Sequence, residues 1–148
     1  MIITKNYRDV DCGALRLSDA GKSIKLAGWV DTIRKLGGIT FVTLRDQYGI
    51  TQLVADESKV AGLSKEDVIS VSGKVVERSS KNPNMPTGDI EIEGESFEIL
   101  GKRLTETLPF EINVEGQNVR EDLRLEYRFL DLRNNDIHNN IKFLRIIF

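Results

Sequence analysis

The stretch Gly28–Val54, GWVDTIRKLGGITFVTLRDQYGITQLV, contains three runs of strand-forming residues separated by two turn signals. The first turn signal is Gly37-Gly38 and the second is Asp46–Gly49 (DQYG), both rich in residues that adopt turn conformations readily. Between them, ITFVTLR is dominated by β-branched and aromatic residues. The stretch therefore predicts three consecutive strands joined by short connections.

Within these strands the side chains alternate between two faces. In ITFVTLR, Val42 and Leu44 would point inward, which places Phe41, Thr43 and Arg45 on the other side. The third run, GITQLVA, carries Ile50, Gln52 and Val54 on one face and Thr51 and Leu53 on the other. This pattern predicts an outer surface that carries Phe41 and Gln52.

Further strands are expected on both sides of this stretch. SIKLAGWV (23–30) alternates apolar residues with period two, and Gly28 within it predicts a bulge or a sharp bend. VISVSGKVVER (68–78) and DIEIEGESFEIL (89–100) supply a fourth and a fifth strand, joined by the turn-rich loop SSKNPNMPTG. A single helical turn is expected in LRLSDAG (15–21), and a short helix or loop in DESKVAGLSKED (56–67).

Five β-rich segments with a short helical insert after the third predict an all-β fold, the partly open five-stranded Greek-key barrel called the OB-fold. A β-sandwich lobe is the alternative. The barrel would occupy residues 1–101, followed by a linker over 102–118 and a helical segment over 119–148.

The helical segment begins in NVREDLRLEYRFLDLRNN, which we predict to be helical throughout together with the residues that follow. Its last part places Ile137, Ile141, Leu144 and Phe148 on one continuous apolar stripe. Such a stripe requires a neighbour, so we expect the chain to be a fragment of a larger protein.

Composition narrows the function classes. The chain has 148 residues and a net charge of -2, with 21 Lys and Arg against 23 Asp and Glu. This balance argues against a protein that binds nucleic acid mainly through phosphates, but it permits a site that recognises a few splayed-out bases. The single Cys12 excludes an internal disulfide and a thiolate zinc site, and the absence of a signal-peptide pattern favours a cytoplasmic location.

Catalytic residues are not evident. His138 lies among asparagines without a cysteine or carboxylate at metal-ligand spacing, and we interpret it as a surface residue. No glycine-rich phosphate loop follows a strand. Most carboxylates, among them Asp31, Asp46, Glu91 and Glu93, are expected to be surface charges.

A binding surface is the better candidate, because OB-folds bind oligonucleotides on the face of strands two and three and through the loops beside it. Phe41 would stack on a base, and the Gln52 amide offers a donor and an acceptor that suit the edge of uracil. Glu91 accepts hydrogen bonds only, which suits the amino group of cytosine. Arg34, just before the first loop, would pair with phosphate or a base edge, and Arg78, Lys81 and Asn82 lie at the loop between strands four and five.

Each of these residues also has a purely structural interpretation. Phe41 would then be packed beneath a loop, Gln52 would be an ordinary strand residue, and Glu91 would be a solubilising charge. Trp29 is interpreted as core or rim packing.

The segments CGALRLSDAGKSIKLAGWV, RKLGGITFVTLRDQYGITQLV, TGDIEI and LRLEYRFLDLR, in this order, resemble the N-terminal part of bacterial-type aspartyl-tRNA synthetases. The resemblance covers nearly the whole chain. It implies an anticodon-binding OB domain over 1–101, a linker, and the truncated start of a class II catalytic domain over 119–148. The positions that would meet the anticodon loop are Arg34, Phe41, Gln52, Arg78, Asn82 and Glu91, with Phe41 and Gln52 on the central uridine and Glu91 on the final cytidine.

For the whole protein the resemblance implies a homodimeric ligase that uses ATP and Mg²⁺, whose catalytic centre would lie beyond Phe148, so that this chain alone would be inactive and without cofactors. Two departures stand out. Asp31-Thr32-Ile33 replace arginines common after Trp-Val, and Asn134 replaces the second arginine after the DLR stretch. The rival interpretations are a lysyl- or asparaginyl-tRNA synthetase, or a generic OB module for protein or single-stranded nucleic acid; no DNA or membrane partner is expected.

Overall fold

The computed structural model describes residues 6–105, 107–114 and 118–147. The chain forms two compact units, Met1–Leu104 and Thr105–Phe148. The first is a β-barrel and the second is helical, and each is described separately below.

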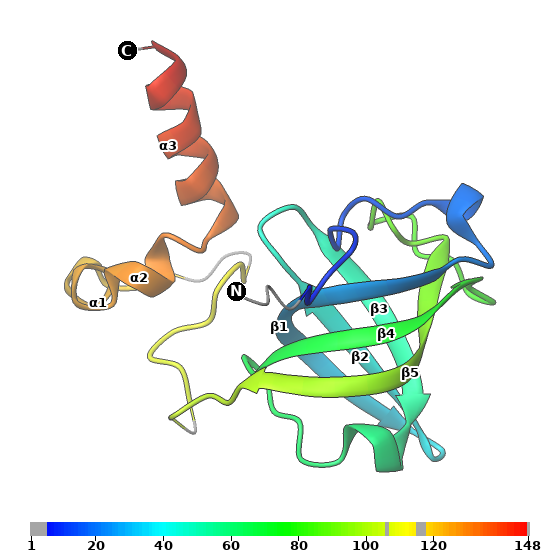
Figure 1. Ribbon diagram of the computed structural model, residues 1–148. Helices are drawn as coiled ribbons and strands as arrows, with labels where there is room; N and C mark the ends of the chain where they lie inside the picture. The colour runs from blue at the N-terminus through cyan, green and yellow to red at the C-terminus, as the bar shows by residue number, and fades with distance from the viewer. Residues whose placement is uncertain (1–5, 106, 115–117, 148) are drawn as a thin grey trace, which may run out of the picture. The chain divides into compact units, whose positions relative to one another are not determined.

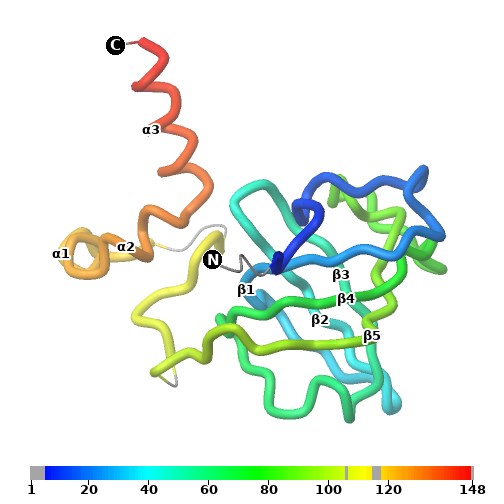
Figure 2. The backbone as a smooth tube through the Cα atoms, viewed as in Figure 1, coloured from blue at the N-terminus to red at the C-terminus, as the bar shows by residue number. Residues whose placement is uncertain are grey.

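The barrel contains five strands: β1 (Ser23–Leu36), β2 (Ile39–Arg45), β3 (Ile50–Asp56), β4 (Val68–Glu77) and β5 (Ile90–Gly101). Their order around the barrel is β1-β2-β3-β5-β4, with β4 pairing back onto β1 (Figures 1 and 2). The neighbours pair antiparallel except β3 and β5, which pair in parallel at two positions only. This order confirms the predicted OB-fold, and the short parallel pairing closes a barrel that we expected to be partly open.

Two short 3-10 helices accompany the strands. One, η1 (Leu17–Asp19), corresponds to the helical turn predicted before Gly21, whose φ of 90° suits glycine. The other, η2 (Glu57–Val60), lies between β3 and β4, where a short helix or loop was expected.

Alternating side chains of the strands form the barrel core, as the sequence predicted. The residues that are less than 2% exposed include Leu26, Val42, Leu44, Leu53, Ile69, Val71, Val75, Ile90 and Ile92. Thr40 and Thr51 are also fully buried at inward positions. The opposite face of β2 and β3 is therefore free to carry other side chains.

β1 is longer than predicted, because it pairs with two neighbours in succession. Residues 23–29 pair with β4 and residues 29–36 with β2, with an irregularity in the β2 register between Val30 and Thr32. The bulge is therefore not at Gly28, where the sequence predicted a bulge or bend. Gly28 instead permits a close approach, since a Cβ there would lie 2.4 Å from the Arg45 carbonyl oxygen.

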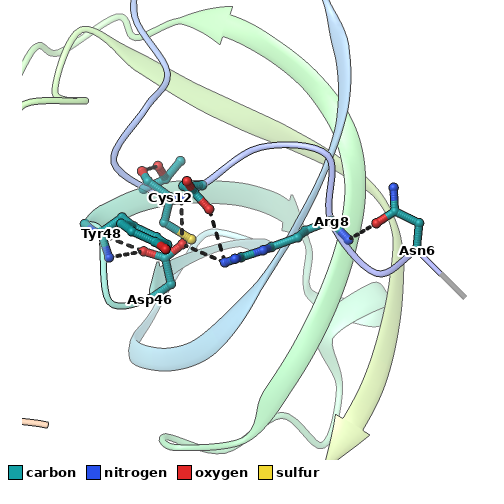
Figure 3. A network of polar contacts seen from close by, with 8 residues as sticks. Asn6, Arg8, Cys12, Asp46 and Tyr48 are labelled. Atoms are coloured by element: carbon teal, nitrogen blue, oxygen red, sulfur yellow. Dashed lines mark hydrogen bonds and ion pairs between the residues drawn. The ribbon is translucent and has the colours of Figure 1, made fainter. Parts of the chain in front are cut away.

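The segment before η1 is fixed to the barrel by Asp46, in the turn between β2 and β3 (Figure 3). One oxygen of Asp46 accepts a hydrogen bond from the Cys12 N–H at 2.9 Å, and the other accepts from the N–H groups of Tyr48 and Gly49 at 2.7 and 2.9 Å. Arg8 lies 3.5 Å from the same carboxylate, whose side chain is 4% exposed. Asp46 is thus a structural residue and not the surface charge that we predicted.

The helical unit contains α1 (Glu121–Glu126), α2 (Arg128–Asp131) and α3 (Asn135–Ile147). The prediction of helix throughout 118–148 was wrong at three places, the first being residues 118–120, which precede α1. At Tyr127 the backbone leaves the helical region, with φ -105° and ψ 45°, and α3 begins anew after Asn134. The Asn134 side-chain oxygen accepts hydrogen bonds from the N–H groups of Asp136 and Ile137, which is how asparagine caps a helix.

A small apolar cluster supports these helices. Phe110, Ile112 and Leu130 are buried together, so residues of the segment predicted as a linker contribute to packing. On α3, Ile141 and Leu144 of the predicted stripe are 44% and 53% exposed, while Phe148 lies outside the described residues. Within the part of the chain that the structure describes, no helix has the length and apolar character needed to cross a membrane.

Candidate nucleic-acid interface

Phe41 lies on the outer face of β2, between the buried inward residues Thr40 and Val42, and is itself half-buried. It pairs across the sheet with Arg34 of β1, whose guanidinium carbon lies 5.1 Å from the centre of the Phe41 ring. The arginine is exposed. A cation above an aromatic ring is attracted by its π-electrons, so Arg34 and Phe41 form one surface unit.

Gln52 lies on the outer face of β3 and pairs directly with Thr43. Because Phe41 pairs with Val54, Phe41 and Gln52 are diagonal neighbours on the same side of the sheet. Diagonal neighbours lie within reach of aromatic and long side chains. Gln52 is also half-buried and not sealed beneath other residues. The structure therefore brings the aromatic ring and the amide together, as the sequence predicted.

Glu91 of β5 continues this surface. It points outward between the buried Ile90 and Ile92, and its Oε2 accepts a 2.8 Å hydrogen bond from the Gln52 Nε2. Arg78, just after β4, places its Nε 3.9 Å from the same oxygen. The side chains of Arg78 and Glu91 are only 11% and 18% exposed, so they are not solvated surface charges.

Asn82 occupies a different position. It lies in the loop between β4 and β5, where its Oδ1 accepts a hydrogen bond from the Asn84 N–H and its N–H donates to the Gly88 carbonyl. The loop is fixed to β3 by Thr87, whose hydroxyl donates to the Ile50 carbonyl at 2.6 Å. Among the contacts of the described residues, none joins the Asn82 side chain to Gln52 or Glu91.

Lys81 in the same loop faces carboxylates of the neighbouring strand ends. Its Nζ lies 2.8 Å from Glu77 and 4.0 Å from Asp89. The hydrogen bond to Glu77, together with the attraction of both carboxylates, raises the Lys81 pKa. This lysine therefore stays charged at the edge of the surface.

Arg45 was expected on the outer side of β2 beside Phe41, but it is only 8% exposed. Its Nε donates to Asp31 at 3.0 Å, and its Nη2 pairs with Glu66. Arg45 also lies 6.0 Å from the centre of the half-buried Trp29 ring, which agrees with a packing role for that tryptophan. The sequence showed no sign of this ion pair, because Glu66 lies in the connection before β4.

The structure thus groups five of the six predicted site residues, which we call the reading face: Phe41, Gln52 and Glu91 on the outer face of β2, β3 and β5, with Arg34 of β1 on the Phe41 ring and Arg78, just after β4, beside Glu91. The family model of the OB-fold nucleic acid binding domain matches residues 24–100. This match covers more than half of the chain and includes the whole reading face.

The chain belongs to the OB-fold nucleic acid binding domain family.

Curated relatives of this OB-fold domain include aspartate–tRNA ligases. The chain is 47% identical over 143 residues to the enzyme of Phocaeicola vulgatus and 50% identical over 142 residues to that of Streptomyces avermitilis. These matches cover 92% and 91% of this chain but only 24% of each relative. The resemblance to bacterial aspartyl-tRNA synthetases is therefore confirmed, and the chain spans about a quarter of their length.

A solved structure supports the fold. The aspartyl-tRNA synthetase of Entamoeba histolytica superimposes with a TM-score of 0.75 over 86% of this chain and 33% of that chain, at 19% sequence identity. At this identity the likeness supports the OB-fold alone.

Elsewhere in the described residues, no group of three or more His, Cys, Asp or Glu side chains is placed to hold a metal ion. His138 is half-buried in α3. Cys12 is fully buried, and burial raises the pKa of its thiol far above the ordinary value, with nearby Asp46 adding to the effect. A thiol in this state is a poor nucleophile, because the thiolate is the reactive form.

Proposed function

We propose that this chain is the part of an aspartate–tRNA ligase that recognises the anticodon loop of its tRNA. The proposal depends on one observation, the adjacency of the Phe41 ring and the Gln52 amide on the reading face. The similarity to aspartate–tRNA ligases supports an aspartate tRNA as the ligand, and the reading face would supply the contacts that recognise it.

Phe41 would provide the stacking surface for the central uridine of the anticodon. Stacking of a base on an aromatic side chain contributes about 1–3 kcal/mol and does not depend on base identity. Arg34, whose guanidinium carbon lies 5.1 Å from the centre of the Phe41 ring, would attract the neighbouring phosphate with its positive charge. Phe41 therefore supplies affinity, and selectivity must come from the groups beside it.

Gln52 would supply the selectivity for the central base, since its amide offers one acceptor and two donors at the Watson–Crick edge. Glu91 would accept a hydrogen bond from the amino group of the final cytidine. Arg78, 3.9 Å from Glu91, and Asn82, in the loop between β4 and β5, would contact the backbone of the RNA.

For the whole protein we propose the ligation of aspartate to tRNA with ATP and Mg²⁺, carried out by a homodimer. The curated relatives, which this chain matches over 24% of their length, support the reaction class. The reading face would contribute recognition of the tRNA and no chemical step.

Titration with an RNA hairpin that carries the aspartate anticodon tests the proposal. Phe41→Ala and Gln52→Ala should each weaken binding by at least about 1 kcal/mol. Phe41→Leu is the matched control for stacking, because it keeps an apolar side chain of similar length but removes the aromatic face. Equal affinities of Phe41→Leu and the unsubstituted protein would refute the stacking role.

Hairpins with altered anticodons separate the rival functions. Replacing the final C by U should weaken binding to this chain, whereas a lysyl- or asparaginyl-type domain would prefer the altered hairpin. A generic single-stranded nucleic-acid module would show no preference for uridine at the central position, and a protein-binding module would not bind the hairpin at all.

A further inference from the structure

The Gln52 amide has a fixed orientation. Its Nε2 donates to Glu91 Oε2 at 2.8 Å, and an ionised carboxylate carries no hydrogen to donate. The amide atom that faces Glu91 must therefore be nitrogen, so the order of nitrogen and oxygen at the Gln52 end is determined by its neighbour. No hydrogen bond among the described residues uses the Gln52 Oε1, which is left for a ligand.

Glu91 is itself held in place. Its backbone lies in β5 opposite Val76 of β4, and the buried neighbours Ile90 and Ile92 keep its side chain on the outer face. Arg78 lies 3.9 Å from the oxygen that also faces Gln52, and both charged side chains are more than four-fifths buried. A carboxylate held between an amide and a guanidinium loses much of its rotational freedom.

We infer that Glu91, held by Arg78, is a positioning residue that fixes the Gln52 amide in the orientation that accepts uracil and rejects cytosine. The inference rests on the proposed function, and it assigns Glu91 an effect on a base that it does not touch. Arg78 would act on Gln52 indirectly, because it holds Glu91 in place.

The selectivity follows from the edges of the two bases. Uracil presents an acceptor at O4 beside a donor at N3–H, whereas cytosine presents a donor at the amino group beside an acceptor at N3. For a base stacked in one place, the Gln52 Nε2 would donate to O4 of uracil and the Gln52 Oε1 would accept from N3–H. With cytosine in the same place, the Nε2 donor would face the donor amino group and the Oε1 acceptor would face the acceptor N3. A freely rotating amide would turn over and pair with either base, whereas an amide fixed by Glu91 pairs with only one.

The same carboxylate leaves one oxygen for the RNA. Glu91 Oε2 faces Gln52 and Arg78, and Oε1 takes part in no hydrogen bond or ion pair among the described residues. Oε1 is therefore available to the amino group of the final cytidine, while Oε2 orients the reader of the central base. One side chain would thus connect the reading of two adjacent bases.

The experiment compares two hairpins that differ only at the central anticodon position, uridine or cytidine, with the final C unchanged in both. The full chain should prefer the uridine hairpin by about tenfold or more, which corresponds to one hydrogen bond lost and a polar group left unpaired. Glu91→Gln is nearly isosteric but donates as well as accepts, so it permits both orientations of Gln52. It should lower the preference at least about threefold, in addition to any loss of overall affinity.

Glu93→Gln is the matched control, since Glu93 lies two residues further along the same strand, is exposed, and loses the same charge. It should leave the preference for uridine unchanged. Arg78→Lys should lower the preference partly, because a lysine keeps the charge but not the planar guanidinium.

The outcomes separate this inference from the proposed function. If the unsubstituted chain shows no preference at the central position, the proposed function fails. If it prefers uridine and Glu91→Gln keeps the full preference, the inference alone is overturned.

A measurement on the free protein keeps the inference testable if Glu91→Gln does not fold. In a ¹⁵N-correlated NMR spectrum the side-chain signals of Gln52, identified by their loss in Gln52→Ala, should differ from those of the exposed Gln47, with one proton shifted downfield by the carboxylate. Signals of Gln52 that coincide with those of Gln47 would show a rotating amide and overturn the inference.

Discussion

Replacement of Asp46 by asparagine should destabilise the barrel unit by about 2–4 kcal/mol. The carboxylate accepts three backbone N–H groups with two oxygens, and asparagine keeps only one of these oxygens. The amide would retain Tyr48 and Gly49 as neutral hydrogen bonds of roughly half the strength, and it would set an NH₂ group against the Cys12 N–H. That unpaired, buried N–H costs about 1–3 kcal/mol, and the lost partner of Arg8 adds up to about 1 kcal/mol.

Urea unfolding followed by the fluorescence of Trp29 measures this change, because Trp29 is the only tryptophan of the chain and lies in β1. The midpoint should fall without a change in the slope of the transition. Asp11→Asn is the control: Asp11 is the other carboxylate beside Arg8, at 3.2 Å and 38% exposed, and it should cost less than about 1 kcal/mol. If the two variants unfold at the same urea concentration, the hydrogen bonds of Asp46 to the Cys12 N–H and to the β2–β3 turn do not stabilise the barrel unit, and the reasoning is refuted.

Two further predictions concern titratable groups. Because burial raises the pKa of the Cys12 thiol, the native protein should resist alkylation at mildly alkaline pH, whereas the urea-unfolded chain should react. Mass spectrometry measures the extent of alkylation. Rapid labelling of the native thiol would contradict this prediction. In the helical unit, Arg124 donates a 2.8 Å hydrogen bond to the buried Asp131 and thereby lowers the pKa of that carboxyl group. The stabilisation from the ionised Asp131 is therefore complete above the unfolded pKa of about 3.9. It is lost as the pH falls through the lower pKa of the folded state. The far-UV helix signal should therefore decrease in that acidic range, and Asp131→Asn should reduce this dependence.

The arrangement of the strands was predictable because the barrel is built on a period of two. In β2, Val42 and Leu44 are buried and Phe41 is not, and in β3, Thr51 and Leu53 are buried and Gln52 is not. This alternation is a local property of the sequence, and a sheet with one buried face preserves it. The same alternation places Phe41 and Gln52 on the outer face of the sheet.

The parts that sequence reasoning missed depend on contacts between distant residues. Arg45 has the outward position that its place in β2 predicts, but Glu66 and Asp31 pair with it and bury it. Asp46 was interpreted as a surface charge because nothing near it in sequence reveals the Cys12 N–H. The break at Tyr127 differs, because the contacts beside it are local: Arg124 and Arg128, on either side of it, both bind Asp131.

The reading face differs from the rest of the barrel in what its side chains do for stability. Phe41 and Gln52 alternate with the buried residues of β2 and β3, so their replacement removes little of the core, whereas a shift of register by one residue would exchange the two sets. The contacts that hold the barrel, at Asp46, Arg45 and Gly28, involve other residues. The exception is the pair of Arg78 and Glu91, which are largely buried and also belong to the reading face. Such a pair is costly to desolvate and is often replaced by apolar residues without loss of stability, so stability alone does not explain its presence. The control of the Gln52 amide that we propose would give the pair a function.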